Sequence, residues 1–74
     1  MSTQGLRDSL ERVVTRVGEL HLDLLELSAH IQDNLVSEPA EPNLHDFLAQ
    51  TNRDIKGTER FLDRLQGRLE ELDA

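Results

Sequence analysis

Aliphatic residues recur at every third or fourth position through the first half of the chain. The members of this run are Leu6, Leu10, Val13, Val17, Leu20, Leu24, Leu27 and Ile31. Steps that alternate between four and three residues form a heptad repeat, which places one apolar stripe along one face of an α-helix. This stripe predicts a helix that packs lengthwise against another helix.

A second run with the same spacing follows a proline-containing break. Its members are Leu44, Leu48, Thr51, Ile55, Thr58, Leu62, Leu65, Leu69 and Leu72. Pro39 and Pro42 separate the two runs, because proline lacks an amide donor and restricts the residue before it. We therefore expect a first helix over about residues 3–35, a turn over about 36–42 and a second helix over about 43–72. Ser2 or Thr3 would cap the first helix, and Asn43 would cap the second.

Two long helices joined by so short a linker form an antiparallel hairpin. We therefore predict one all-α, coiled-coil-like domain spanning residues 1–74. Its expected core is Leu6, Leu10, Val13, Val17, Leu20, Leu24, Leu27, Ile31, Leu48, Ile55, Leu62, Leu65, Leu69 and Leu72. Leu20 would lie opposite Leu62, and a slip of about three residues is the alternative register. Thr51 and Thr58 either bond their hydroxyls to the preceding turn, the simpler interpretation, or weaken a core layer and fix the register.

A second apolar stripe lies on the first helix, away from the heptad residues. It contains small or apolar side chains, and Phe47 and Phe61 flank the apolar face of the second helix. A two-helix hairpin covers only one stripe, so these residues would remain exposed without a partner. We expect a partner or oligomer interface formed by Val14, Gly18, Leu22, Leu25, Ala29, Phe47 and Phe61. Two hairpins would then pair into a four-helix bundle as a homodimer. The alternative is that both phenylalanines only fill the hairpin core.

The small size and the acidic charge of the chain also favour association with other proteins. A chain of 74 residues buries little surface by itself, and without cysteine it forms no disulfide or thiolate metal site. The net charge of -7 disfavours nucleic acid and anionic membranes, and it favours protein partners. The first residues resemble no signal peptide, and no apolar run reaches about 18 residues. We expect a cytoplasmic protein.

The sequence contains no clear chemical motif. Asp23, Glu26 and His30 have a spacing at which a divalent ion could bind weakly, but an ordinary solvated helix face is the simpler interpretation. No spacing pairs a nucleophile with a base, and no glycine-rich phosphate loop occurs. We therefore expect a non-enzyme without a cofactor or metal.

Basic residues on the second helix suggest one competing function. Arg53, Lys56, Arg60, Arg64 and Arg68 follow one another along it, with acidic residues between them. Small dimeric helical hairpins such as the RNA-binding regulator Rop are similar in architecture, although no residue can be matched. We expect a protein–protein interaction or assembly module (an adaptor, co-chaperone or regulatory subunit), with a Rop-like nucleic-acid-binding regulator as the alternative. In either case the apolar stripes would bury helix against helix.

Overall fold

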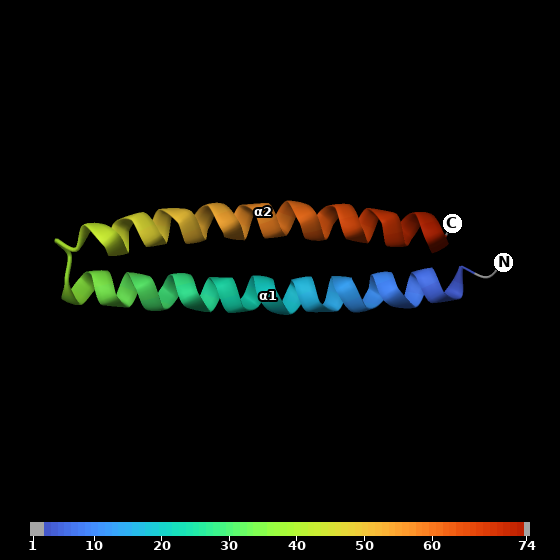
Figure 1. Ribbon diagram of the computed structural model, residues 1–74, viewed down its shortest axis with the longest axis horizontal. Helices are drawn as coiled ribbons and strands as arrows, with labels where there is room; N and C mark the ends of the chain where they lie inside the picture. The colour runs from blue at the N-terminus through green and yellow to red at the C-terminus, as the bar shows by residue number, and fades with distance from the viewer. Residues whose placement is uncertain (1–2, 74) are drawn as a thin grey trace.

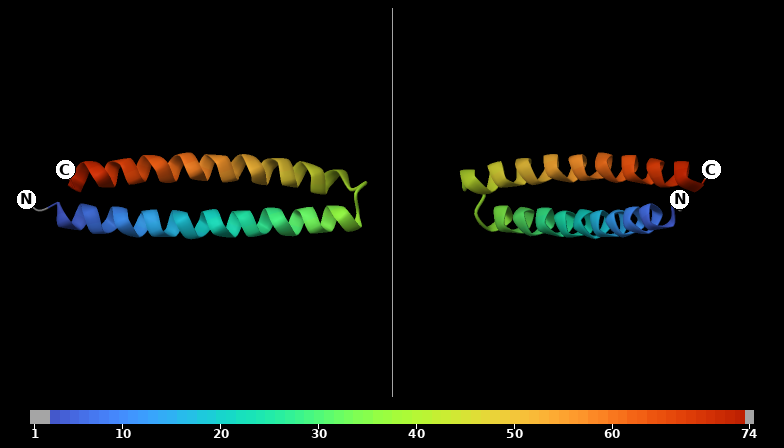
Figure 2. Two further views of the ribbon diagram at one scale, coloured as in Figure 1. Left: turned by 180° about the vertical axis from the view of Figure 1, so that it is seen from behind. Right: turned by 45° about the vertical axis from the view of Figure 1, so that its right-hand side comes forward.

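The chain folds into two long antiparallel helices. The computed structural model describes residues 3–73, with α1 at Gln4–Ser37 and α2 at Pro42–Asp73. The two helices lie side by side along their whole length, and the start of α1 lies beside the end of α2 (Figure 1). Figure 2 shows the same pairing from two other directions. The Cα trace forms a rod with extents of 58 × 14 × 14 Å. The prediction of an all-α antiparallel hairpin is confirmed.

The helix boundaries differ from the predicted ones by one or two residues. Helix α1 continues to Ser37, and the Thr3 side chain makes no capping hydrogen bond. Ser2, the other predicted cap, lies outside the described residues. Helix α2 begins at Pro42, so Asn43 lies inside the helix and is not its cap. The reason is that proline at the first helical position loses no hydrogen bond, while the Glu41 carboxylate accepts the Asn43 amide at 3.1 Å.

The turn between the helices is held by hydrogen bonds to its own backbone. The Glu38 amide donates to the Asn34 carbonyl oxygen at 2.8 Å, which closes the last turn of α1. The His45 ring donates from Nε2 to the carbonyl oxygen of Pro39 at 2.9 Å. These bonds tie the start of α2 to the turn and fix the direction in which the chain reverses.

The core is narrow because only two helices contribute to it. Among the described residues, the buried apolar side chains are Val17, Ile31 and Ile55, and they are joined by the buried polar residues Ser28 and Thr51. The other predicted core residues that face the seam are half-buried, namely Leu10, Leu24, Leu48, Leu62, Leu65, Leu69 and Leu72. A seam between two helices leaves such side chains open on their outer edges.

Helix α1 turns a different face toward α2 from the one predicted. Four predicted core residues are between 37% and 61% exposed, namely Leu6, Val13, Leu20 and Leu27. Their places in the seam are taken by Val14, His21, Ser28 and Leu35, which are buried or half-buried. The assignment of those four residues to the hairpin core is therefore wrong. The small Ser28 side chain lies buried in this seam, and its hydroxyl is satisfied there.

Two hydrogen bonds between the helices define their register. The His21 ring lies 3.3 Å from the Glu59 carboxylate, and the Ser28 hydroxyl donates to the Asn52 side-chain oxygen at 3.2 Å. The predicted register would place His21 opposite Phe61, so the helices are offset by two residues from that prediction. Thr58 donates its hydroxyl to the Asp54 carbonyl oxygen at 2.8 Å, as the simpler interpretation of that residue predicts.

An ion-pair cluster joins the helices at the end opposite the turn. The Arg7 guanidinium donates a hydrogen bond to the Glu11 carboxylate at 3.1 Å and forms an ion pair with Asp73 across the hairpin. The hydrogen bond that Arg7 donates to the Glu11 carboxylate, followed by the negative charge of Asp73, raises the pKa of Arg7. Arg7 therefore keeps its charge at any ordinary pH, and the pairing holds the first turn of α1 near the last turn of α2.

Candidate interaction surface

One side of the rod carries a continuous row of large apolar side chains. We name this surface the apolar flank and define it by Leu6, Val13, Leu20 and Leu27 of α1 with Phe47 and Phe61 of α2. All six are at least 37% exposed. The four α1 residues are seven apart, so they repeat along one line of the helix, and the two phenylalanines are two heptads apart on α2.

Two shallow grooves show that the apolar residues of both helices share this side. The first, of about 390 Å³, lies toward the end of the hairpin opposite the turn, which we call the open end. It is lined by Leu6, Leu10, Val13, Leu65 and Leu72, with Ser9, Arg68 and Glu71 at its edge. The second lies near the middle of the rod, where Leu20 and Phe61 line one depression of about 460 Å³. The Arg64 guanidinium lies 5.6 Å from the centre of the Phe61 ring, so it partly shields that ring.

Charged residues border the apolar flank in an uneven pattern. On α1, Arg16 is a surface neighbour of Val13 and Leu20, because residues three and four apart adjoin on a helix. By the same spacing Asp23 adjoins Leu20 and Leu27. On α2, Arg68 and Glu71 belong to the groove at the open end, and Arg53 and Asp54 belong to the groove near the middle. Arg16 and Arg68 lie toward the open end, where Arg68 pairs with Glu71, and Asp23 and Asp54 lie toward the turn, where Arg53 lines the same groove as Asp54.

The opposite side of the hairpin is polar. Here His21 pairs with Glu59, and Ser28 links Asn52 to Gln32, whose side-chain amide donates to the Ser28 hydroxyl at 3.2 Å. We name these residues the polar flank. Both sides border the same seam. The apolar flank exposes six large apolar side chains, whereas the exposed Leu25 adjoins His21 and Ser28 on the polar flank. Sequence reasoning missed Ser28 as a seam residue because serine does not count toward an apolar stripe.

The residues of the predicted interface fall into three places. Val14 and Gly18 are half-buried. Phe47 and Phe61 belong to the apolar flank. Leu22, Leu25 and Ala29 are exposed on the outer side of α1, in line with Val36, and we name these four residues the outer stripe. A Cβ placed on Gly18 would meet nothing within 4 Å, so the hairpin itself gives no packing reason for glycine there.

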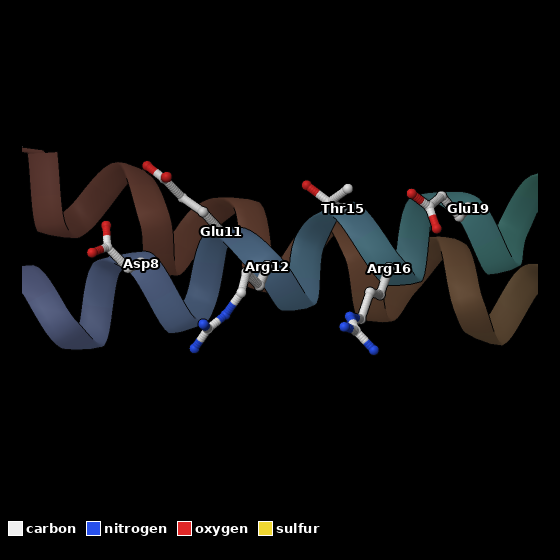
Figure 3. Close-up of a pocket in the computed structure, with 6 residues that line it drawn as sticks. All are labelled: Asp8, Glu11, Arg12, Thr15, Arg16 and Glu19. Carbon is white, nitrogen blue, oxygen red and sulfur yellow. The ribbon is translucent and has the colours of Figure 1, made fainter.

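The outer surface of α1 offers a broad depression but no enclosed site. It measures about 610 Å³ and is lined by Asp8, Glu11, Arg12, Thr15, Arg16 and Glu19. All six side chains come from α1, with α2 behind it (Figure 3). Figure 3 also shows Arg12 and Arg16 pointing together to one side of the helix. A surface of one helix cannot surround a substrate as catalytic pockets do.

The spacing of Asp23, Glu26 and His30, which would allow weak binding of a divalent ion, does not produce a cluster of ligands. His30 lies 3.6 Å from Glu26, as an ordinary pair one helical turn apart. Within residues 3–73, no three His, Cys, Asp or Glu side chains are grouped closely enough to hold an ion. The partners of the buried Ser28 hydroxyl are amide side chains, so no base is in place to activate it.

The basic residues of α2 have few carboxylate partners. In the part of the chain that the structure describes, Arg68 is the one member of the series that forms an ion pair, with Glu71 at 3.3 Å. Arg53 instead donates to the side-chain oxygen of Gln50 at 2.8 Å. The acidic residues between the cations therefore neutralise the series less than their spacing suggests.

Comparison with protein-family models, with curated proteins and with solved structures finds no match to this chain. Neither of the two described helices combines the length and the apolar character needed to cross a membrane. The apolar flank and its charged border are therefore the features on which a function can be argued.

Proposed function

We propose that this protein is a small protein–protein interaction or assembly module without enzymatic activity. It acts by burying the apolar flank against helices of a partner, which is either a second copy or another helical protein. The single observation that supports this proposal most is the row of exposed Leu, Val and Phe side chains along the apolar flank of the rod. A contiguous apolar surface of this size on a small protein is typical of an interaction site.

The energetics of the apolar flank favour association. Burying a large apolar side chain completely contributes about 2 kcal/mol, so covering side chains that are about half exposed contributes roughly 1 kcal/mol each. Six such residues offer a gross gain of several kcal/mol per copy, from which the entropy lost on association must be subtracted. Helix-on-helix packing is the geometry that covers a straight stripe of this length.

Substitution of Leu20 tests the proposal. Leu20→Glu places a carboxylate in the middle of the apolar flank, at a position exposed enough to leave the hairpin folded. We expect the wild type to associate, with itself or with a protein recovered by crosslinking and affinity capture, and we expect Leu20→Glu to lose that association. Leu22→Glu is the matched control on the outer stripe and should keep it. Light scattering and affinity capture provide the readout, and circular dichroism checks the fold.

A wild type that stays monomeric and captures nothing would refute the proposal. Loss of association in Leu22→Glu but not in Leu20→Glu would move the interaction surface to the outer stripe, which contains Leu22, Leu25 and Ala29 of the interface predicted from the sequence.

The Rop-like alternative rests on the basic residues of α2, because Arg53, Lys56 and Arg60 form no ion pair within the described part of the chain. If they contact phosphates, binding to RNA should weaken steeply with increasing salt. Apolar helix packing is much less sensitive to salt, so a salt titration of each binding activity separates the two functions.

A further inference from the structure

We infer that the partner on the apolar flank is a second copy of this chain, packed with its turn at the open end of the first. This inference rests on the proposed interaction function, since it names the occupant of the same surface. The apolar residues supply the contact, and the uneven charges on its border determine the orientation. The result is a four-helix bundle in which each α1 lies against the α1 of the second copy.

The size of the apolar flank fits a second copy. A side of the rod 58 Å long and 14 Å wide presents roughly 800 Å², which is about the area each partner buries in a stable interface of standard size. A two-fold axis through the middle of the flank makes the surface self-complementary. Leu20 and Phe61 share the groove near the middle, so each of them would meet its own counterpart there.

On each helix, one cation and one carboxylate of the border lie on opposite sides of the same point. On α1, Arg16 lies four residues before Leu20, and Asp23 lies three residues after it. On α2, Asp54 and Arg68 each lie seven residues from Phe61, on opposite sides. A two-fold axis across the rod therefore places Arg16 near Asp23 of the second copy, and Arg68 near Asp54 of the second copy. Each contact occurs twice in the dimer.

The other closed arrangement, with both turns at the same end, brings like charges together. It places α1 against α2 of the second copy. The hydrogen bonds of His21 to Glu59 and of Ser28 to Asn52 show that Arg16 is level with Arg64. In this arrangement Arg16 would face Arg64 of the second copy across the interface. Like charges opposed across an interface select against that orientation.

Single cysteines test this geometry directly, because the natural chain contains none. Leu20→Cys should form a disulfide with itself on mild oxidation, since a disulfide needs Cα atoms within about 7 Å. Val13→Cys and Leu27→Cys should each crosslink poorly alone and readily when mixed. Leu22→Cys on the outer stripe is the control and should stay uncrosslinked. All four positions are exposed in the hairpin, so none of these variants should disturb the fold.

A charge exchange provides a second, independent measurement. Arg16→Asp alone and Asp23→Arg alone should each weaken the dimer about tenfold at low salt, because both copies lose a pair and gain a repulsion. The double variant Arg16→Asp with Asp23→Arg should recover most of the affinity. The single-variant effects should shrink at high salt, where exposed charges are screened.

Three outcomes would overturn the inference. One is a wild type that stays monomeric in light scattering at all concentrations. The second is a Leu22→Cys disulfide in place of the Leu20→Cys disulfide, which would assign the interface to the outer stripe. The third is crosslinking between Val13→Cys and Arg68→Cys, which only the arrangement with both turns together brings close. If the monomer still captures another protein through Leu20, the proposed interaction function stands and only the second copy is excluded.

Discussion

At the scale of single residues, Ser28 is a buried polar side chain that links the two helices. It is 6% exposed, its hydroxyl donates to Asn52, and it accepts from Gln32. The small side chain lets α1 lie close to α2, and the two hydrogen bonds offset the cost of burying a hydroxyl. A larger residue at this point would push the helices apart and favour the Leu27 side of α1 as the inner face.

Substitutions of Ser28 measure separately the effect of its small size and the effect of its two hydrogen bonds. We expect Ser28→Ala to lower the free energy of unfolding by about 1 kcal/mol, since it removes the two hydrogen bonds without adding volume. Ser28→Leu should lower it by about 2 kcal/mol, because the seam has no room for the extra methyl groups. Urea unfolding followed by circular dichroism gives both values. The exposed Ser9→Ala is the control and should change the free energy by less than about 0.5 kcal/mol.

At the scale of the helices, α1 has a wider apolar face than one partner helix can cover. Val17 and Ile31 are buried in the seam, while the neighbouring row represented by Leu20 and Leu27 is exposed. Helix α2 turns its heptad stripe toward the seam as expected, and Phe47 and Phe61 are exposed beside that stripe. A helix with apolar rows on two adjacent sides is typical of a bundle with more than two helices.

The sequence predicts the existence, length and pairing of the helices well, because heptad spacing and the two prolines act locally. It identifies Val17 and Ile31 correctly, since they lie in the middle of the wide apolar face. It fails at Leu20 and Leu27 because periodicity shows that a face is apolar but not which half of it the neighbouring helix covers. That choice depends on the fit of Ser28 in the seam, a contact between residues 24 positions apart.

Alanine at Ile31 and at Leu27 should therefore have different consequences. Ile31→Ala should lower the free energy of unfolding by about 2 kcal/mol or more at every protein concentration, because it empties part of the seam. Leu27→Ala should cost less than about 1 kcal/mol in dilute protein, where its side chain remains partly in water. The loss of unfolding free energy in Leu27→Ala should increase with protein concentration if association buries the Leu27 side chain. Equal losses for both variants in dilute protein would contradict the observed rotation of α1.

At the scale of the whole molecule, the hairpin is a thin rod with little interior. Three apolar side chains are buried within residues 3–73, and most of the seam is open at its edges. A domain this small gains limited stability from its own core. Covering the apolar flank would add the burial that two helices alone do not provide, so folding and association should be linked.

This linkage predicts that thermal stability depends on protein concentration. The midpoint of thermal unfolding should rise by several degrees between about 1 and 100 μM protein, since mass action favours the associated, folded state. Leu20→Glu should abolish this dependence and unfold at a lower, constant midpoint. Scanning calorimetry at three or more protein concentrations measures how the midpoint depends on concentration. A wild-type midpoint that stays constant over this range would show that the hairpin is stable without a partner.

The difference between the two flanks has a consequence for the size of any assembly. A rod with apolar residues on both sides of its seam would add further rods without limit and precipitate or form fibres. Here the polar flank, with the His21–Glu59 and Ser28–Asn52 pairs, offers no second apolar surface beside the seam. An assembly that consumes the apolar flank would therefore leave no second apolar row along the seam, and any further growth would have to use the outer stripe of Leu22, Leu25, Ala29 and Val36.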